Sequence, residues 1–510
     1  MKHKEQHRLK KLLFFMRPLH KSRKDWQGFR EFLVSPLHGN SQREAEILDQ
    51  IGSILENDES GANAEKILCE AILPDHDYAL AATKSNLRRR LNPILEHYYA
   101  YEALLSFQKD EVAQWKYVVQ KANRSRWDAY FIWLYTNKAQ KALDALPRTE
   151  LYHIHQMFFA EQLDYFLSRQ NNEAAEIENR YQEELNALID LHAIQLLKLA
   201  CNKLNYHLLT KKATPPNTPI LAELIRELER SWESQDALVK MYFHILQGLY
   251  GTDQDQHYFV LKPILFNEAL KYGKEEARTL FQHATNLCMR RYNSYKSNGE
   301  AASTLTFQQE ILRLYNYKLE QGIIFREYNG RAYIDHGDFK NIVLIFSKME
   351  EFDWVQNFID QYGNQVLKNM QGVVKNFNYG VLAFFKKEFR AAERLFNLVR
   401  QDLRDSNDQY YALSAKGYYL RVLFELQKFD DCEREAKNIA KSINRNKLLP
   451  ASQKEKALQL CFHIRDLCRA VTETTNKQNS TLDQLSLKIE SGAPSFSLEW
   501  LREKVKAARK

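Results

Sequence analysis

Three short charged stretches in the last third of the chain repeat one pattern, in which a charged turn precedes a phenylalanine between two apolar helical runs. They are residues 349–353 (MEEFD), 386–390 (KKEFR) and 426–430 (LQKFD). The phenylalanines Phe352, Phe389 and Phe429 lie 37 and 40 positions apart. A repeat of this length is typical of stacked helical hairpins, because one hairpin cannot bury its apolar face alone. The spacing therefore predicts an all-α superhelix, a solenoid of stacked hairpins.

Composition supports helices over sheet. Glycine is scarce, 16 of 510 residues or about 3%, against a usual ~7%. Such a shortage argues against β-rich folds and against glycine-rich phosphate loops, which need a flexible backbone. Apolar residues recur with a helical period in most of the chain, as in residues 127–134 and 220–228. At 510 residues the chain exceeds one compact core, so either several domains or one elongated array is expected.

The positive charge belongs to one end of the chain. The net charge is +8, and the first 30 residues hold ten Lys and Arg against two acidic residues. The other 480 residues are therefore formally neutral. This distribution weakens the interpretation of the body as a nucleic-acid-binding domain.

Neither a membrane span nor a disulfide framework is predicted. The N-terminal apolar run, residues 12–16, is too short for a secretory signal, and no stretch approaches the ~18 apolar residues of a spanning helix. We therefore expect a cytoplasmic protein. The six cysteines form no C-x-x-C pair and are expected to be reduced, buried thiols. Cys461 and Cys468, with His463 between them, are interpreted as helix packing and not as a metal site.

Breaks in the helical pattern suggest four segments. The strongest break is the proline pair within residues 211–218, and others fall at residues 328–338 and 472–480. Capping boxes at Ser41, Thr306 and Ser452 mark three expected helix starts. The predicted segments are residues 1–140, an irregular helical module with a basic arm; 141–337, degenerate hairpins; 338–471, the clearest repeats; and 472–510, a polar linker with a final amphipathic helix.

The clearest repeat resembles a tetratricopeptide repeat. In residues 379–396, Gly380 takes the place of the small residue that lets paired helices approach, and Ala392 and Phe396 fill the seam on the second helix. The flanking repeats keep apolar character at the corresponding positions without the family's signature residues. These positions are Val343, Val355 and Ile359 around Phe352, and Leu420, Cys432 and Ala436 around Phe429. The resemblance covers about 110 residues, and it implies a helical superhelix that presents a binding surface.

Two further features are similar to those of uncharacterised bacterial helical-repeat proteins. They are residues 29–36 (FREFLVSP), followed by Asn40, and the pair Trp500 and Leu501. The similarity implies a bacterial cytosolic protein and supplies no function.

The repeat register predicts a groove. If the first helix of each hairpin lines the concave side, Lys340, Phe377, Phe384 and Arg421 face it. Aromatic and Arg side chains often anchor partners at interfaces. The alternative is that Phe377 and Phe384 are core contacts between hairpins, because aromatic stripes at helical spacing usually pack. Lys340 and Arg421 would then be ordinary solvated charges.

No catalytic, cofactor or metal motif stands out. The zinc-protease, Walker, Rossmann and nucleophile-elbow patterns are absent from the sequence. His153 and His155 point about 200° apart on a helix, so we expect structural or surface roles for them. The predicted site therefore contains no catalytic, cofactor-binding or metal-ligating residue.

Two basic features offer an alternative function. Arg88, Arg89 and Arg90 lie in a helix that continues into an aromatic stretch, residues 98–101. Basic groups beside aromatic rings bind single-stranded RNA by neutralising phosphates and stacking bases. More often such a triplet is a solvated helix face.

The N-terminal arm also carries an apolar stripe, Leu9, Leu12, Leu13 and Met16. This stripe either lies on an anionic membrane surface or docks as the first cap of the solenoid.

The sequence thus predicts a non-enzymatic helical-repeat scaffold that binds a protein or peptide partner through its concave groove. The alternative is an RNA-associated helical protein that uses the basic arm and residues 88–90. The sequence names neither the partner nor an oligomeric state.

Overall fold

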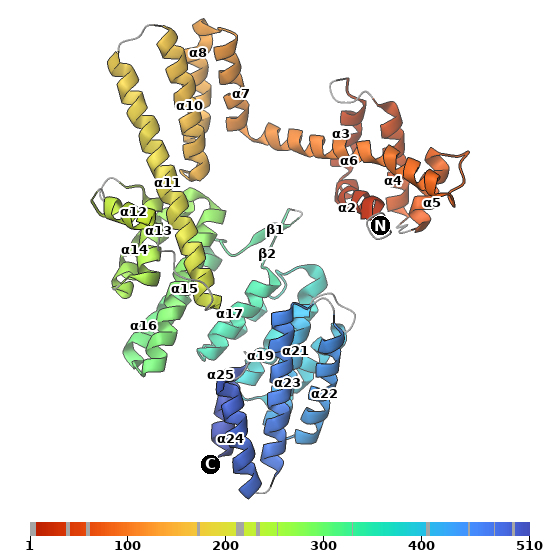
Figure 1. Ribbon diagram of the computed structural model, residues 1–510, viewed down its shortest axis with the longest axis vertical. Coiled ribbons are helices and arrows are strands. Elements are labelled where there is room, and N and C mark those ends of the chain that lie inside the picture. The colour runs from red at the N-terminus through yellow and green to blue at the C-terminus, as the bar shows by residue number, and fades with distance from the viewer. Residues whose placement is uncertain are drawn as a thin grey trace. The chain divides into compact units, whose positions relative to one another are not determined.

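The computed structural model describes residues 7–36, 41–57, 62–170, 174–210, 219–230, 235–251, 253–328, 330–403, 409–446, 449–473, 475–491 and 495–509. These residues are almost entirely helical, and most helices pack against a neighbour in the chain (Figure 1). The predicted all-α fold is confirmed. None of the described helices combines the length and the apolar character needed to cross a membrane.

The chain divides into two compact units. The first comprises Met1–Ala200 and Pro216–Lys240, and the second comprises Cys201–Pro215 and Met241–Lys510. This division is coarser than the four predicted segments, which stay a prediction.

The first unit contains helices α2 to α12, with α11 running on into the second unit. Their bounds are α2 His7–Lys21, α3 Arg23–Val34, α4 Gln42–Glu56, α5 Ala62–Ile72, α6 Ala81–Lys109, α7 Glu111–Arg124, α8 Asp128–Leu134, the π-helical turn Tyr135–Ala139, α9 Gln140–Asp144, α10 Glu150–Arg169, α11 Ala174–Thr210 and α12 Pro219–Arg230.

Two apolar clusters hold the first unit. The first is built by α2 to α6 and includes Phe29 and Phe32, whose rings pack on Tyr101. The second is built by α7 to α10 around Phe131 and Phe166, whose rings stack with centroids 4.3 Å apart. Each cluster gives its own helices an interior.

The apolar stripe of the N-terminal arm belongs to the first cluster. Leu12, Leu13 and Met16 are 2%, 8% and 0% exposed. These three side chains therefore dock within the first unit, and the alternative that they lie on a membrane surface is wrong. The side chain of Leu9 lies outside the described residues.

The second unit contains the remaining helices and one hairpin. Their bounds are α13 Ala237–Tyr250, α14 Gln254–Glu268, the 3-10 turn Ala269–Tyr272, α15 Lys274–Asn298, α16 Ala301–Glu320, β1 Arg326–Tyr328, β2 Arg331–Tyr333, α17 His336–Lys348, α18 Phe352–Tyr362, the 3-10 turn Lys368–Met370, α19 Gln371–Phe385, α20 Phe389–Asp402, α21 Gln409–Glu425, α22 Phe429–Arg445, α23 Ala451–Thr472, α24 Thr475–Ser491 and α25 Leu498–Ala508.

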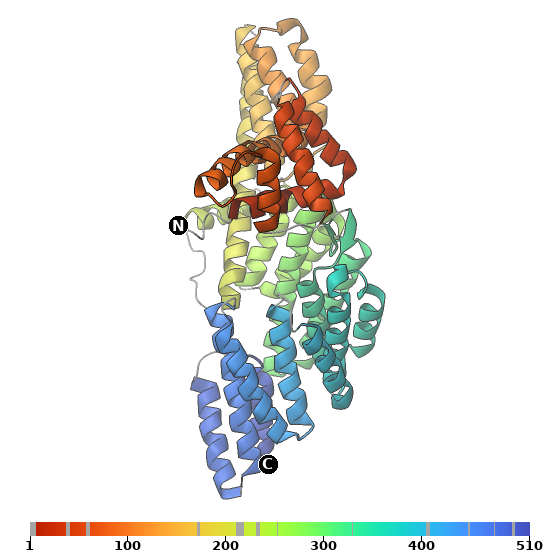
Figure 2. The same ribbon diagram turned by 90° about the vertical axis from the view of Figure 1, so that its right-hand side faces the viewer.

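The two strands pair antiparallel, with Glu327 opposite Ala332. This hairpin lies at the predicted break in residues 328–338 and is the sole sheet in the described part of the chain. Helices α21 to α25 pack side by side, as both views show (Figures 1 and 2).

Of the three expected helix starts, the one at Ser41 is confirmed, and the side chain of Ser452 lies outside the described residues. The Ser41 hydroxyl accepts a hydrogen bond from the Glu44 amide and caps α4. The expected cap at Thr306 is wrong, because this residue lies inside α16 and its hydroxyl donates to the Ala302 carbonyl. A threonine hydroxyl can bond the carbonyl of the preceding turn as well as an exposed amide, so the motif alone does not fix a helix start.

The three charged turns share one backbone geometry. The second residue of each, Glu350, Lys387 and Gln427, is left-handed with φ of 65°, 64° and 59°. The amide that follows it donates to the carbonyl five residues back, at 2.8–3.0 Å in the three turns, which is the helix-ending Schellman arrangement. A new helix then begins at Phe352, Phe389 or Phe429. The predicted hairpin repeat is thus present in backbone detail.

The same turn also joins two other pairs of described helices, at Arg126 between α7 and α8 and at Gly299 between α15 and α16. The sequence pattern missed both, because Asp128 and Ala301 stand where the other turns have phenylalanine. Helical hairpins with this connection therefore extend beyond the three that the pattern marks.

Gly380 allows close approach within the central hairpin. A Cβ atom added here would lie 2.9 Å from Cε1 of Phe396. Phe396 is fully buried and stacks on Tyr418, with ring centroids 5.3 Å apart. The seam positions Ala392, Val343, Val355, Ile359, Leu420, Cys432 and Ala436 are all buried.

The final helix packs on its own unit. Helix α25 contacts α23 and α24, and its Trp500, Leu501 and Val505 are buried. Lys348 of α17 forms an ion pair with Glu499 of α25 at 3.1 Å. The amphipathic segment predicted in residues 472–510 therefore docks against several hairpins.

We expect Gly380→Ala to destabilise the second unit by about 1–2 kcal/mol, because the new methyl group overpacks a ring that is held on its other face. The matched control is Gly372→Ala in the same helix, where an added Cβ meets nothing within 4 Å. That change should stabilise by about 0.5–1 kcal/mol through helix propensity. Urea unfolding midpoints measure both, and equal effects of the two substitutions would contradict the close approach.

Candidate functional site

The second unit contains a groove of about 2500 Å³. It is lined by parts of α11, α15 and α16, by the first helices of the three marked hairpins (α17, α19 and α21), by parts of α22 and α23, and by α25. The first helices of the three successive hairpins thus contribute to one surface. The groove is the candidate site.

Three of the four predicted groove residues line it. Lys340 of α17, Phe384 of α19 and Arg421 of α21 come together there from three successive hairpins. The Lys340 Nζ atom contacts the Ser414 hydroxyl at 3.4 Å and lies 5.3 Å from the ring centroid of Tyr411.

The prediction for Phe377 is wrong. This residue is fully buried and does not line the groove. Its ring packs edge-on against Phe396, Tyr411 and Tyr418, with centroids 5.0–5.9 Å away. Helix α21 closes over this turn of α19, so the core alternative describes Phe377.

Phe384, two turns further along α19, serves both roles. It is 7% exposed and packs edge-on against Phe389 and Tyr418. One face also lies beneath the guanidinium of Arg421, whose central carbon is 4.9 Å from the Phe384 centroid and 3.7 Å from the Tyr418 centroid. A guanidinium at these distances makes cation–π contacts with both rings.

Arg421 is a buried charge. It is 8% exposed, and its Nε atom is buried without a hydrogen-bond partner. No hydrogen bond or ion pair joins its side chain to another described residue. It is therefore not the solvated charge of the alternative interpretation.

The groove carries a moderate positive charge. Ten lysine and arginine residues and six acidic residues line it, an excess of four basic groups. The basic residues are Arg278, Lys296, Lys318, Arg326, Lys340, Lys348, Lys387, Lys416, Arg421 and Lys504, and the acidic residues are Asp335, Asp338, Glu350, Glu425, Glu499 and Glu503.

Lys318 is a second buried cation in the lining, and sequence reasoning missed it. It is 4% exposed, and its Nζ atom lies 4.3 Å from the ring centroid of Tyr315. Burial lowers the pKa of Lys318 to about 8. The sequence could have indicated that Lys318 is buried, because this residue follows Ile311 and Leu314 at helical spacing on the apolar face of α16.

Comparisons with protein-family models, with curated proteins and with solved structures found no match. The site is therefore interpreted from its own geometry.

The described residues contain no group of three or more His, Cys, Asp or Glu side chains arranged to hold a metal ion. All six cysteines are buried free thiols, as expected. His153 and His155 are also buried, and burial lowers the pKa of each. These side chains are packing residues of their helices.

The arginine triplet of α6 lies in the first unit. Arg89 is exposed, and its guanidinium donates to the Asn86 side chain at 3.3 Å. Arg90 is half-buried, and the side chain of Arg88 lies outside the described residues. Leu87 and Leu91 on either side are buried. The RNA hypothesis for residues 88–90 stays a prediction.

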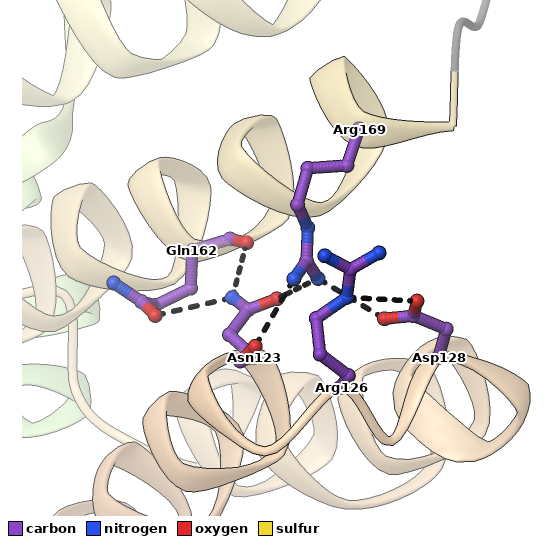
Figure 3. Close-up of polar contacts among 5 residues, drawn as sticks. All are labelled: Asn123, Arg126, Asp128, Gln162 and Arg169. Carbon is purple, nitrogen blue, oxygen red and sulfur yellow. Dashed lines mark hydrogen bonds and ion pairs between the residues drawn. The ribbon is translucent and has the colours of Figure 1, made fainter.

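A polar network in the first unit joins the α7–α8 turn to α10 (Figure 3). Asn123 is 2% exposed, and its amide donates to the Gln162 carbonyl and side-chain oxygens at 2.8 and 3.1 Å. Arg169 donates to the Asn123 carbonyl and side-chain oxygens at 3.1 and 3.0 Å and to Asp128 at 3.1 Å. Arg126 approaches the other Asp128 oxygen at 3.5 Å. The guanidinium of Arg169 thus donates hydrogen bonds to the acceptors of Asn123 near the end of α7. The network therefore has a structural role.

We expect Arg169→Met to destabilise this region by about 2 kcal/mol, because it removes charge-assisted hydrogen bonds and strands buried acceptors. Hydrogen–deuterium exchange of α7 and α10 peptides provides the measurement. Arg124→Met, at an exposed arginine of α7, is the control and should change exchange little. Equal protection in both variants would contradict the role of the network.

A histidine pair predicts acid sensitivity of the second unit. The Nδ1 atoms of His244 and His257 lie 3.0 Å apart. Burial, and then the neighbouring His257, lowers the pKa of His244 to about 4. The unfolded chain, with its ordinary value of ~6.5, therefore binds the proton before the folded chain does, so stability is full above pH ~6.5 and falls as the pH drops towards about 4.

The difference between the pKa of His244 in the unfolded chain and in the folded chain corresponds to a loss of about 3 kcal/mol in the free energy of unfolding once the pH is below both values. His244→Gln should remove this part of the pH dependence, which urea unfolding at pH ~7 and pH ~4.5 would show. An unchanged difference between the two pH values in the variant would exclude His244 as its source.

Proposed function

We propose that the second unit is a non-enzymatic scaffold that binds another protein or a peptide in its groove. The observation that carries the proposal is the size of the groove. About 2500 Å³ exceeds the ~300–1,000 Å³ typical of small-molecule sites. A groove of this volume suits an extended chain segment better than a metabolite.

The chemistry of the lining supports a protein partner. Phe384, Trp500 and Arg421 are of the residue types that most often anchor partners. Polar amide side chains such as Asn286 and Asn341 lie among them and can pair with the amides and carbonyls of a bound backbone. The groove therefore offers both anchors and backbone partners.

The resemblance to tetratricopeptide repeats adds a second line of support. The turns of the three marked hairpins share one geometry, and Gly380, Ala392 and Phe396 pack as that family's pattern implies. In that family the first helices line the concave binding side, and here α17, α19 and α21 line the groove.

Site-directed photocrosslinking tests this function. A benzoylphenylalanine at Asn341 or Leu413, both in the groove lining, should crosslink a discrete second polypeptide in cells. The same probe at Leu398, which is 47% exposed on α20 and outside the groove, should not. Loss of the product on adding excess unlabelled partner would support a specific site. Identical products from Leu398, or none from either groove position, would overturn the proposal.

A further inference from the structure

Arg421 forms no ion pair with the glutamate that follows it on helix α21. Glu425 lies four residues further along α21, the spacing at which an arginine and a glutamate usually pair. The Glu425 carboxylate instead accepts from the Trp500 indole at 2.7 Å and from the Lys504 ammonium at 2.8 and 2.9 Å. Both donors belong to α25, so the final helix occupies the carboxylate that would otherwise neutralise Arg421.

Two aromatic rings pack against the guanidinium of Arg421. The centroids of Tyr418 and Phe384 lie 3.7 and 4.9 Å from its central carbon. Ring contacts of this kind do not neutralise the charge, and the N–H donors of a guanidinium can still form a fork to a carboxylate. Because Arg421 lines the groove, a ligand bound there can supply that carboxylate.

A buried cation needs a counter-charge, since removing it from water costs free energy that ring contacts only partly offset. The described residues supply none to Arg421. An anionic group of a bound partner would supply this counter-charge.

We propose that Arg421 anchors an acidic side chain of the bound partner, and that α25 keeps this anchor available by holding Glu425. The inference rests on the proposed function and deepens it, because it assigns the partner's chemistry and gives the C-terminal helix a role in binding. Displacement of α25 would release Glu425 to pair with Arg421 and would close the site.

The lining favours an acidic peptide over a nucleic acid. Six carboxylates face the groove with the ten basic groups, and they would repel a continuous phosphate backbone. A peptide with a few acidic side chains meets the basic groups singly and places neutral backbone beside the carboxylates.

The first experiment measures binding of a defined probe to the full-length protein. The probe is a fluorescein-labelled twelve-residue peptide of alternating Glu and Ala, and fluorescence anisotropy at low salt gives its affinity. R421Q should weaken binding about 10-fold or more, the usual effect of losing a charge-assisted hydrogen bond. R394Q, at an exposed arginine of α20 outside the groove, removes the same charge and should weaken binding less than about 2-fold.

The matched peptide of alternating Gln and Ala separates specific from general contacts. It should bind R421Q and the unaltered protein equally. Equal weakening of the Glu peptide by R421Q and R394Q would overturn the anchor. A ten-nucleotide oligouridylate that binds more tightly than the Glu peptide and is lost in R421Q would overturn the choice of partner class.

The second experiment tests the role of α25 by a cycle of substitutions. K504M should weaken binding of the Glu peptide about 10-fold, because the Glu425 carboxylate, then held by the Trp500 indole alone, can pair with Arg421. The double variant K504M/E425Q should restore binding to within about 2-fold of the unaltered protein, since no carboxylate remains to compete. Helix content and melting temperature compared across the set separate this effect from unfolding.

Failure to restore binding in the folded double variant would overturn the role of α25 while leaving the anchor intact.

Failure of the anchor is also distinct from failure of the proposed function. A groove-specific crosslinked partner whose binding is unaffected by R421Q would overturn the inference alone, whereas absence of any groove crosslink would remove the function beneath it.

Discussion

An unbroken set of aromatic contacts connects the core of the central hairpin to the floor of the groove. Phe396 lies against Gly380, stacks on Tyr418 and meets Phe377 edge-on. Tyr418 in turn packs on Phe384 and contacts the guanidinium of Arg421. Each hairpin buries its apolar seam only against its neighbour. The rings that close the seam between hairpins are thus the same rings that shape the candidate site.

This sharing makes the groove stiff around Arg421. Interiors are packed as densely as molecular crystals, so a ring held on several sides cannot turn freely. Tyr418 and Phe384 are both buried, and Arg421 lies on their faces. A cation–π contact is worth about 2 kcal/mol or more when desolvated, which offsets part of the cost of burying the charge. Residues of the final helix bind the carboxylate of Glu425, which therefore does not pair with Arg421.

Sequence reasoning reached the periodic parts of this structure. The hairpin turns, the helix starts at Phe352, Phe389 and Phe429, and the close approach at Gly380 follow from spacing and residue size, which act locally. It missed the equivalent turns at Arg126 and Gly299, because backbone geometry recurs there without the phenylalanine that marks it elsewhere. Sequence reasoning wrongly placed Phe377 in the groove. A helical period shows which residues share a face of the helix, but it does not show which neighbouring helix covers each turn of that face.

The sequence by itself determined that this chain is helical, that its helices form hairpins, and that three residues, Lys340, Phe384 and Arg421, share a side of the repeat. Local hydrogen bonding and apolar periodicity decide these properties within a few turns of chain. Only the tertiary structure decided that Arg421 is buried, that Lys318 joins the lining, and that Glu425 is held by Trp500 and Lys504, which follow it by 75 and 79 residues. Burial and charge pairing depend on which distant segments meet, and no local pattern records that choice.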